Sequence, residues 1–404
     1  MDLLNEKEVK SVVEQYGNFD LLDFKITNYS ETLIGYLGKH LKLVANVNAN
    51  GRLAELKFFV KCLPKDKWIA QFLMESGFFR KEFTMLSVLF NQFERNEDEC
   101  KWRPKALLLK EYVFVFEDVK ELGYAMANQK STLNYNETMA VVQTLARFHA
   151  QSFIYEEKKS LELQKPYRIW DDFSEYLQEP KNKDWRNAGR NAAIEFLKVF
   201  SKHRWEPLFS EKVTNLFHLL FDDAFDLMRP STKYRNTVVH RDLWSNNILL
   251  KNENGECGAL IIDFQTVLYC PPTMDLSSLI YMNTAKSFRD KHIGEILDFY
   301  YKVLSKEVED KIGIDFATIL SMNEFMESYD ESVLFGLTQA AIVIPITAMK
   351  VEERERLFCD SESIHRINNV SRTKEVIHVA NEDAEYYSRL IDLFEDILDK
   401  YYLR

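Results

Sequence analysis

The chain has 404 residues, a hydrophobic content of 46% and a charged content of 28%, which predict a globular protein of about two to three domains at roughly 150 residues each. Its formal net charge of −11 speaks against nucleic acid as a partner, because an acidic surface repels phosphate backbones. The five cysteines are scattered without a C-x-x-C pair, so neither a disulfide framework nor a zinc site is expected.

The first third of the chain is expected to be rich in strands. Residues 41–47 alternate apolar and polar side chains, and residues 53–63 resume the pattern after Asn50-Gly51. Asn-Gly between two such runs predicts a β-hairpin, because both turn residues can adopt positive φ. The next elements expected are a helix over residues 69–93 and two short strands within residues 106–117. Together they predict a small antiparallel sheet with one helix.

The remainder is expected to be mainly helical. Asn134 and Glu137 match a capping box, which predicts a helix from there through about residue 153. The apolar residues 336–349 predict a buried helix broken near Pro345, too short to span a bilayer. Further helices are expected near residues 191–202, 211–228, 291–304 and 382–402, and short strands at residues 237–240, 247–251 and 259–263.

The most informative segment lies among those short strands. Residues 238–250 read V-V-H-R-D-L-W-S-N-N-I-L-L and place His240, Asp242 and Asn247 in the pattern H-x-D-x-x-x-x-N, and a second apolar run ends at Asp263. Phosphoryl transfer needs alignment and charge neutralisation more than covalent help. Asp242 is therefore expected to orient an attacking hydroxyl and accept its proton. Asn247 and Asp263, at the ends of adjacent strands, are expected to hold Mg²⁺, which prefers hard oxygen ligands.

A loop whose polar residues only cap strand ends is the alternative for residues 240–247, the segment we call the catalytic loop. The second strand that ends in an aspartate, Asp263, argues against that alternative.

The strand that follows the hairpin turn ends in a charged residue, Lys61. A charge among apolar residues is costly to bury without partners, and Lys61 is expected to hold the α- and β-phosphates of ATP. Alone, it would more often be a solvent-facing strand lysine. Glu82, on the next predicted helix, is the candidate ion-pair partner, and Glu75 is a weaker rival.

Two more segments are candidate nucleotide contacts. Gly35 and Gly38 precede the hairpin and could let backbone amides approach phosphates, although they do not complete a G-x-G-x-x-G motif and a plain turn is the alternative. Glu117 and Val119 follow the last strand of the small sheet, and their backbone groups are expected to contact adenine. An ordinary strand exit is the alternative there.

The other polar residues near these motifs are expected to support them. His149 lies on the apolar face of its helix and is expected to be a hydrogen-bonded core histidine. Asp275 is expected to cap the next helix and to brace the catalytic loop. Trp244, Tyr281 and Met282 are candidate walls of a substrate pocket, although a core role suits each of them as well.

These motifs resemble the ecdysteroid kinase-like family, which is related to aminoglycoside phosphotransferases and choline kinases. The resemblance covers roughly residues 30–280. It is carried by the segments V-F-E-D (115–118), L-A-R-F-H-A (145–150), H-R-D-L-W-S-N-N (240–247) and L-I-I-D-F-Q (260–265), with Lys61 and Glu82 in the positions of the family's strand lysine and helix glutamate.

The resemblance implies an α+β, bilobal protein-kinase-like fold, with a small antiparallel-sheet N-lobe (residues 1–119) and a larger, mainly helical C-lobe (residues 120–404). It also implies ATP- and Mg²⁺-dependent phosphorylation of a hydroxyl on an ecdysteroid or another steroid or xenobiotic alcohol. Two features depart from the family pattern: the glycine loop is poorly matched, and Arg241 stands where glycine is expected more often.

Three other functions were weighed against this one. A protein kinase needs a long activation segment, but only seven residues separate Gln265 from Thr273. A catalytically silent pseudokinase would be expected to lack one of the polar motif residues, and none is missing. A choline or ethanolamine kinase needs an aromatic cage or acidic residues around the cation, and the tryptophans and Tyr281 leave that alternative open.

The partner expected is therefore a small-molecule alcohol, with no obligate protein partner. Residues 1–8 lack the basic and apolar regions of a signal peptide. Together with the scattered cysteines, this favours a reduced, cytoplasmic protein that does not contact a membrane.

Overall fold

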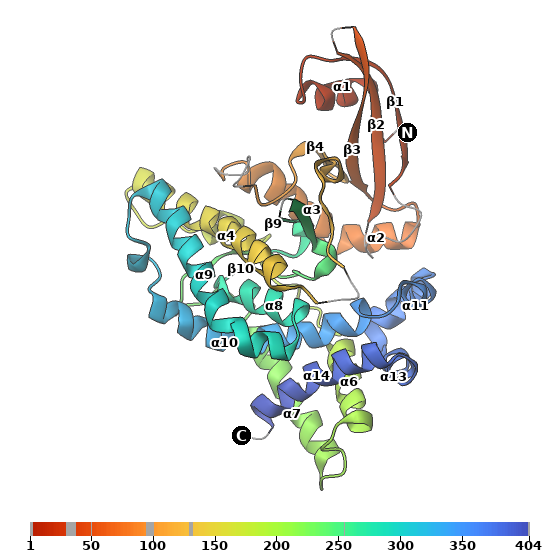
Figure 1. Cartoon of the computed structure of the whole chain (residues 1–404), viewed down its shortest axis with the longest axis vertical. Helices are drawn as coiled ribbons and strands as arrows, with labels where there is room; N and C mark the ends of the chain where they lie inside the picture. Colours follow the sequence, from red (N-terminus) through yellow and green to blue (C-terminus); the bar gives the residue numbers. More distant parts are fainter. Residues whose placement is uncertain are drawn as a thin grey trace. The chain divides into compact units, whose positions relative to one another are not determined.

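The computed structural model describes residues 3–29, 38–49, 51–93, 101–128, 132–253 and 255–402. The chain forms two compact units, of which the first comprises Met1–Met126 with Leu249–Thr266 and the second comprises Ala127–Ile248 with Val267–Arg404. The α+β class is confirmed, with an antiparallel sheet in the N-terminal part and a mainly helical C-terminal part (Figure 1). The lobe boundary after residue 119 stays a prediction.

The first unit is built on a five-stranded antiparallel sheet in the order β1-β2-β3-β5-β4. The predicted hairpin is present, since β2 and β3 pair as far as Ala49↔Arg52, and Gly51 has a φ of 86°. Asn50, the other residue of the predicted turn, lies outside the described residues. The strands are β1 (Asp20–Asn28), β2 (Lys39–Ala49), β3 (Arg52–Cys62), β4 (Ala106–Lys110) and β5 (Val113–Glu117).

A helix that the sequence analysis did not predict covers part of this sheet. Helix α1 (Glu6–Glu14) begins with a capping box at Asn5 and buries Val9, Val12 and Val13. These valines join Val60 and other inward-facing strand residues in one apolar core. Strand β1, which was not predicted either, pairs with β2 at the edge of the sheet.

The single helix expected over residues 69–93 is in fact broken. Helix α2 (Lys67–Glu75) is followed by α3 (Phe78–Thr84) and by a π-helical turn, η1 (Met85–Leu89). The break occurs at Gly77, whose φ of 72° is left-handed and cannot continue an α-helix. The break places Glu82 on α3.

The short strands within the helical region are present, but they belong to two sheets. In the second unit, β7 (Thr237–Val239) pairs with β10 (Leu268–Cys270). A three-stranded sheet has the order β6-β8-β9, with the bounds β6 (Ala125–Met126), β8 (Ile248–Glu253) and β9 (Glu256–Ile261).

The second unit packs long helices around α8 (Thr273–Asn283) and α10 (Met322–Thr347), which lie side by side (Figure 1). Gly336 permits this approach, because a Cβ there would lie 2.9 Å from the backbone of Ser277. The other helices are α4 (Tyr135–Leu163), α5 (Ile169–Phe173), α6 (Asp184–Phe200), α7 (Phe209–Asp226), α9 (Lys286–Ile312), α11 (Val351–Leu357), α12 (Ser361–His365), α13 (Thr373–Glu382) and α14 (Ala384–Tyr401).

The buried helix expected to break near Pro345 is present, and it ends at Thr347, two residues after the proline. Helix α10 continues through Pro345 to Thr347, and the hydroxyl of Tyr386 donates to the Pro345 carbonyl at 2.7 Å. Pro345 has no N–H to donate to the carbonyl of Ala341, four residues earlier, so α10 lacks that intrahelical bond. Within the described residues, no single helix is long and apolar enough to cross a membrane, and only α10 and α11 together, bent by 92°, meet that criterion.

Candidate active site

Three charged residues of the first unit meet at the end of strand β3. The ammonium group of Lys61 lies 2.5 Å from Oε2 of Glu82, on α3, and 2.7 Å from Oδ1 of Asp263, which follows β9. Lys61 and Glu82 are 4% and 2% exposed. Glu75, the weaker candidate, is exposed and accepts a hydrogen bond from Gln71 instead.

The pKa values of Lys61 and Glu82 are shifted because both groups are buried beside other charges. Burial lowers the pKa of Lys61, but the carboxylates of Asp263 and Glu82 more than offset it, so the pKa is raised. Burial raises the pKa of Glu82 to about 7, although Lys61 opposes the shift. One cation is thus shared between two carboxylates, and Lys61 stays charged at neutral pH.

Asp263 is held in an uncommon backbone conformation. Its φ is 73°, a left-handed value that costs a non-glycine residue about 1–2 kcal/mol. The next residue, Phe264, packs edge-on against Phe90 and Trp102, with ring centroids 5.1 and 5.6 Å away. Gln265 donates to Oδ2 of Asp263 at 3.2 Å. These contacts compensate the strain and fix the direction of the carboxylate.

The catalytic loop, in the second unit, joins Asp242 to Asn247. Nδ2 of Asn247 donates to the Asp242 carbonyl at 2.8 Å and to its Oδ2 at 3.1 Å. Because the amide nitrogen makes both bonds, the amide oxygen is the atom that Asn247 would offer to a cation. The carboxylate of Asp263 and the amide oxygen of Asn247 are ligands of the kind that Mg²⁺ prefers, so these residues fit the predicted metal.

A buried aspartate braces this loop, as predicted. Asp275 accepts hydrogen bonds from the backbone amides of His240 at 2.5 Å and Arg241 at 2.6 Å. The prediction that Asp275 caps its helix is wrong, because α8 begins after Pro272 and Asp275 lies within the first turn. Its carboxylate accepts from the backbone of the catalytic loop and does not cap α8.

The predicted core role of His149 is confirmed. The ring is fully buried, with Nε2 at 3.1 Å from Asp275 and Nδ1 at 2.6 Å from the hydroxyl of Tyr300. Burial lowers the pKa of His149, against the opposing effect of Asp275, so the ring is neutral at pH 7. We infer that Nε2 donates to the carboxylate and that Nδ1 accepts from Tyr300. Nothing in the sequence around Tyr300 signalled this contact.

Glycine was expected at the position of Arg241, and the backbone conformation there would suit a glycine. Its φ of 75° is left-handed, which glycine adopts without strain. The guanidinium donates to Oε1 of Glu179 at 2.5 Å, and both side chains are nearly buried. This ion pair ties the segment before α6 to the catalytic loop. Glu179 was not predicted, because a lone glutamate in a loop carries no signal.

The predicted nucleotide contacts belong to the first unit. Gly38 has a φ of 100°, and its Cα faces Lys61 and Phe79, whose nearest atoms would be 3.8 Å from an added Cβ. Gly35 lies outside the described residues. The amide of Glu117 donates to the Lys105 carbonyl at 3.0 Å.

Val119 begins the short helix η3 (Val119–Leu122) and is buried. Its carbonyl accepts from the amides of Gly123 and Tyr124. Among the residues that the structure describes, no group of three or more His, Cys, Asp or Glu is arranged to hold a metal ion.

Comparison with known proteins gives one family match. The sequence matches the ecdysteroid kinase-like family over residues 34–312. No curated protein is similar enough in sequence to count as a match.

Solved structures similar to this chain include an ethanolamine kinase of Plasmodium vivax, with 14% identity, a TM-score of 0.39 and coverage of 96% of this chain and 87% of that one. Another is a microcompartment-associated aminopropanol kinase, with 13% identity, a TM-score of 0.39 and coverage of 95% and 94%. Likenesses at this level say nothing about substrate.

Proposed function

Because the chain belongs to the ecdysteroid kinase-like family, we propose that it transfers the γ-phosphate of ATP to a hydroxyl of an ecdysteroid or of another steroid or xenobiotic alcohol. The broader class, a small-molecule kinase that acts on an alcohol, follows from the family. The observation that carries the proposal is the buried contact of Lys61 with both Glu82 and Asp263. A buried lysine shared by two carboxylates is ready to exchange a carboxylate for a phosphate.

The nucleotide is assigned to the first unit. Lys61 holds the α- and β-phosphates, and Glu82 keeps the lysine charged and aimed. Gly38 leaves the approach to Lys61 without a side chain, and we assign Gly35 to the same phosphate-binding segment. The Glu117 amide and the Val119 carbonyl already bond within the chain, so the adenine contacts are assigned to the carbonyl of Glu117 and the amide of Val119.

Asn247 and Asp263 are the residues that would hold Mg²⁺. These two residues would hold the ion where its positive charge would neutralise the charge that develops on the phosphates. Gln265 and Asp242 support the two ligands, because Gln265 bonds to the second oxygen of Asp263 and Asp242 accepts from the amide of Asn247. Each ligand is therefore held by a neighbouring side chain.

Asp242 is assigned as the base that orients the acceptor hydroxyl and takes its proton. The bond from Asn247 Nδ2 fixes the Oδ2 oxygen, so the carboxylate cannot rotate freely. Asp275 fixes the backbone on the preceding side through the amides of His240 and Arg241. A base held from both sides needs little reorganisation when the hydroxyl arrives.

Two alternatives remain in the proposal. A choline or ethanolamine kinase would use the same phosphoryl-transfer residues on a cationic alcohol. A pseudokinase would bind a nucleotide without turnover. Against the second, Lys61, Asp242, Asn247 and Asp263 are all present and hydrogen-bonded. We also propose a cytoplasmic location, because the scattered cysteines without a C-x-x-C pair suit a reducing compartment.

The test is a substrate panel. The full chain is incubated with Mg·ATP and with ecdysone, other sterols, phenolic glycosides, choline or ethanolamine, and mass spectrometry looks for a product heavier by one phosphate. We expect phosphorylated ecdysone or another uncharged alcohol, formed by the wild type and lost in Asp242→Asn. Phosphocholine as the main product would favour the amino-alcohol alternative. Mg·ATP binding without any product would favour the pseudokinase.

A further inference from the structure

Helix α8 holds the catalytic loop through backbone contacts. Asp275, in the first turn of α8, accepts from the amides of His240 and Arg241. At the other end of the helix, Nδ2 of Asn283 donates at 2.7 Å to the carbonyl of Leu243. Because only backbone atoms of the loop take part, these contacts would also form with glycine in the place of Arg241.

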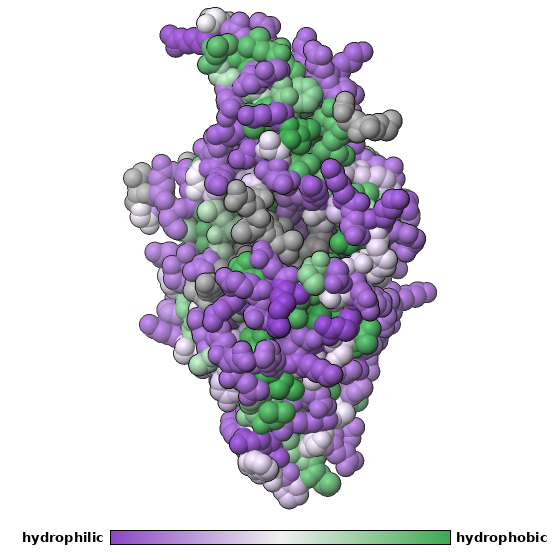
Figure 2. Space-filling model, turned by 90° about the vertical axis from the view of Figure 1, so that its right-hand side faces the viewer, coloured by the Kyte–Doolittle hydropathy of each residue, from purple (hydrophilic) through white to green (hydrophobic). Residues whose placement is uncertain are grey.

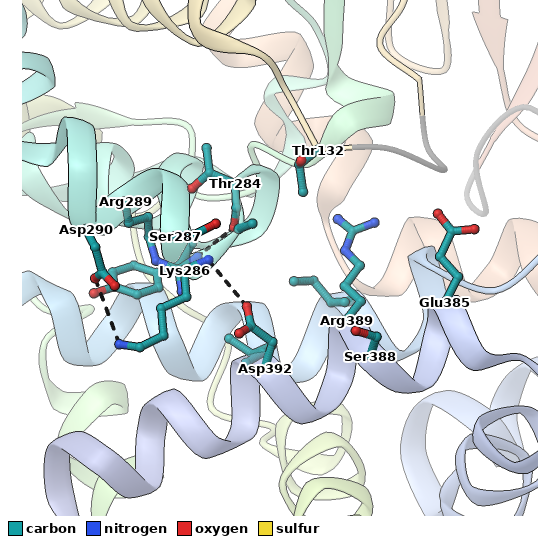
Figure 3. Close-up of a pocket in the computed structure, with 14 residues that line it drawn as sticks. Thr132, Thr284, Lys286, Ser287, Arg289, Asp290, Glu385, Ser388, Arg389 and Asp392 are labelled. Carbon is teal, nitrogen blue, oxygen red and sulfur yellow. Dashed lines mark hydrogen bonds and ion pairs between the residues drawn. The ribbon is translucent and has the colours of Figure 1, made fainter.

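The end of α8 also lines a cavity of about 660 Å³ that lies between α8, α9 and α14 (Figure 3). Tyr281, which was predicted as a wall of the substrate pocket, lines this cavity, whereas Trp244 and Met282 do not. The lining includes three basic and three acidic residues. Because charges of both signs are present, the cavity suits a cationic alcohol as well as an uncharged one.

The side chain of Arg241 makes a further contact, with a carboxylate that lies outside α8. Its guanidinium donates to Oε1 of Glu179 at 2.5 Å, and the two side chains are 10% and 11% exposed. A charge-assisted hydrogen bond is stronger when it is shielded from water. A glycine at position 241 would lack this contact altogether.

The segment between α5 and α6 is built to present Glu179. Pro180 follows Glu179 directly, and a residue before proline is restricted to extended backbone angles. Two residues earlier, Leu177 is buried, and its amide donates to the Ser174 carbonyl at 3.3 Å. The carboxylate is therefore carried by an anchored segment.

A second arginine depends on the same carboxylate. Arg186, in the first turn of α6, is buried, and its Nη1 donates to Oε1 of Gln339 on α10 at 3.1 Å. Burial lowers the pKa of Arg186 to about 10; Arg241 adds to this effect, and Glu179 opposes it. Two guanidinium groups therefore share one carboxylate.

This cluster has few hydrogen bonds of its own. In the described part of the chain, Nη2 of Arg186, Nε of Arg241 and Oε2 of Glu179 have no hydrogen-bond partner. Glu179 and Arg241 are joined by a single hydrogen bond. Without the carboxylate, two buried cations would repel each other, which is costly away from water.

The backbone of Arg241 needs to be held because it is strained. Its φ of 75° is left-handed, and a non-glycine residue keeps such an angle only where its surroundings enforce it. The peptide bond after Arg241 leads directly to Asp242. If Arg241 relaxed to an ordinary backbone angle, that peptide would turn and the carboxylate of Asp242 would move.

Resting on the proposed function, we propose that Glu179 is a positioning residue of the phosphoryl transfer, which acts through Arg241 to keep Asp242 aligned with the acceptor hydroxyl. Arg186 makes the carboxylate harder to replace, because its loss would leave two cations together. A glycine at position 241 would adopt the same backbone angle without a side-chain partner, so the role of Glu179 is tied to the arginine.

A double-mutant cycle tests the proposal. Glu179→Gln removes the charge, Arg241→Gly removes the strained side chain, and the full chain is measured with each change and with both. The matched control is Asp222→Asn on α7, where an exposed aspartate pairs with Lys183. The measured quantities are kcat and the KM for Mg·ATP, with the alcohol identified by the substrate panel. Circular dichroism verifies that each variant is folded.

We expect Glu179→Gln to lower kcat about tenfold, because left-handed strain corresponds to a factor of this order. The KM for Mg·ATP should change by less than about twofold, since the nucleotide is bound elsewhere. In the Arg241→Gly background the same change should alter kcat by less than about twofold. Asp222→Asn should leave both quantities unchanged.

A role of Glu179 in stability alone would lower kcat equally in both backgrounds. That result would overturn the proposal, and so would an unchanged kcat in Glu179→Gln.

Glu179→Asp keeps the charge and is the second variant, to be used if Glu179→Gln does not fold. Its carboxylate is one methylene shorter, so the contact with Arg241 is weakened without being lost. It should lower kcat less than Glu179→Gln does, and only where Arg241 is present. An equal loss in the Arg241→Gly background would again overturn the proposal.

Amide hydrogen exchange of residues 240–247 separates this proposal from the proposed function, because it requires no turnover. Glu179→Gln should speed exchange in this segment when Arg241 is present and leave it unchanged in the Arg241→Gly background. If that pattern appears but no variant phosphorylates an alcohol, the proposed function fails while the hold of Glu179 on the loop stands. If Glu179→Gln exchanges as slowly as the wild type, the hold itself is refuted.

Discussion

Two motif residues, Arg241 and Asp263, adopt left-handed backbone angles that few non-glycine residues take. Such strain persists where surrounding contacts enforce it, and it is concentrated at functional sites. At Arg241 the enforcing contacts are Asp275 on the backbone amide and Glu179 on the guanidinium. The departure from the family's glycine therefore has a structural explanation in a side-chain contact that glycine lacks.

This strain predicts that Arg241→Gly is more stable than Arg241→Ala, the reverse of the usual order for these two residues. Arg241→Gly and Arg241→Ala both remove the ion pair with Glu179, but glycine accepts a φ of 75° and alanine does not. Arg241→Gly should therefore be more stable than Arg241→Ala by about 1 kcal/mol. Urea unfolding of both variants measures the difference. A more stable alanine variant would mean that the loop relaxes to another backbone conformation.

The raised pKa of Glu82 predicts a pH effect on stability in buffer without Mg²⁺ or nucleotide. A carboxyl whose pKa rises on folding, here to about 7, contributes stability that is present below its unfolded pKa and is lost as the pH rises through 7. Glu82→Gln mimics the protonated form. We expect wild type and Glu82→Gln to unfold alike near pH 5, and the wild type to be less stable by up to about 3 kcal/mol near pH 8.

Thermal unfolding across this pH range measures the difference, and Glu75→Gln on the exposed face of α2 is the matched control, for which no such trend is expected. If the wild type were the more stable protein at pH 8, Lys61 would be holding Glu82 ionised throughout.

At the scale of elements, helix α8 links the catalytic loop to the helical core. Asp275, in its first turn, receives both backbone amides that precede Asp242, and Asn283, at its end, donates to Leu243. Gly336 lets α10 press against the same helix. A displacement of α8 would therefore move the catalytic loop as well.

Replacing Asp275 tests this role of α8. In Asp275→Asn the amide keeps one acceptor oxygen for the partners of the carboxylate, His149 among them, so at least one buried donor loses its partner. We expect the free energy of unfolding to fall by about 2–4 kcal/mol, and kcat to fall more than the affinity for Mg·ATP. Denaturant titration and steady-state kinetics measure the two effects.

The control is Asp298→Asn on α9, where an exposed aspartate pairs with Lys302. Its effect on both quantities should be small. A stable and fully active Asp275→Asn would show that the brace is dispensable.

Elements with strong local patterns were predictable from sequence, and elements defined by their neighbours were not. The hairpin of β2 and β3 follows from Asn50-Gly51, and α4 begins at the predicted cap, Asn134. Strand β1 contains the alternating run Phe24-Lys25-Ile26-Thr27, and Phe24 and Ile26 pack against the core, so the sequence held a signal for this strand that the prediction missed. The break at Gly77 was missed because the apolar periodicity continues across it.

The same contrast holds for the candidate site. Glu82 was predicted as the ion-pair partner of Lys61, and the structure also brings Asp263, predicted as a metal ligand, into contact with Lys61. Glu179, Asn283 and Tyr300 were not predicted, because each acts through one contact with a residue far away in sequence. No local pattern encodes such a contact.

At the scale of the whole molecule, the surface agrees with an acidic protein that binds a small ligand. Hydrophilic residues cover most of the face drawn in Figure 2, with hydrophobic patches between them. The net charge of −11 means that a nucleotide is attracted only where basic groups and a divalent cation offset the acidic residues. Binding of ATP is therefore expected to depend on Mg²⁺.

The dependence of ATP binding on Mg²⁺ can be measured as a change in Tm. A ligand that binds only the folded state stabilises it by about 2.7 kcal/mol at roughly 100 times its Kd. We expect ATP with Mg²⁺ to raise Tm of the wild type, and ATP with EDTA to raise it much less. In Asp263→Ala most of the Mg²⁺-dependent increment should disappear. An undiminished increment in that variant would exclude Asp263 as a metal ligand.

The central claim is that this chain transfers phosphate to an alcohol with Asp242 as the base. The most direct measurement follows label from the γ-phosphate of ATP into the alcohol identified by the substrate panel, for wild type and Asp242→Asn, together with the Mg·ATP affinity of each. The account predicts that Asp242→Asn binds Mg·ATP as the wild type does and transfers label at least about 100-fold more slowly. Equal transfer by the two proteins would contradict it.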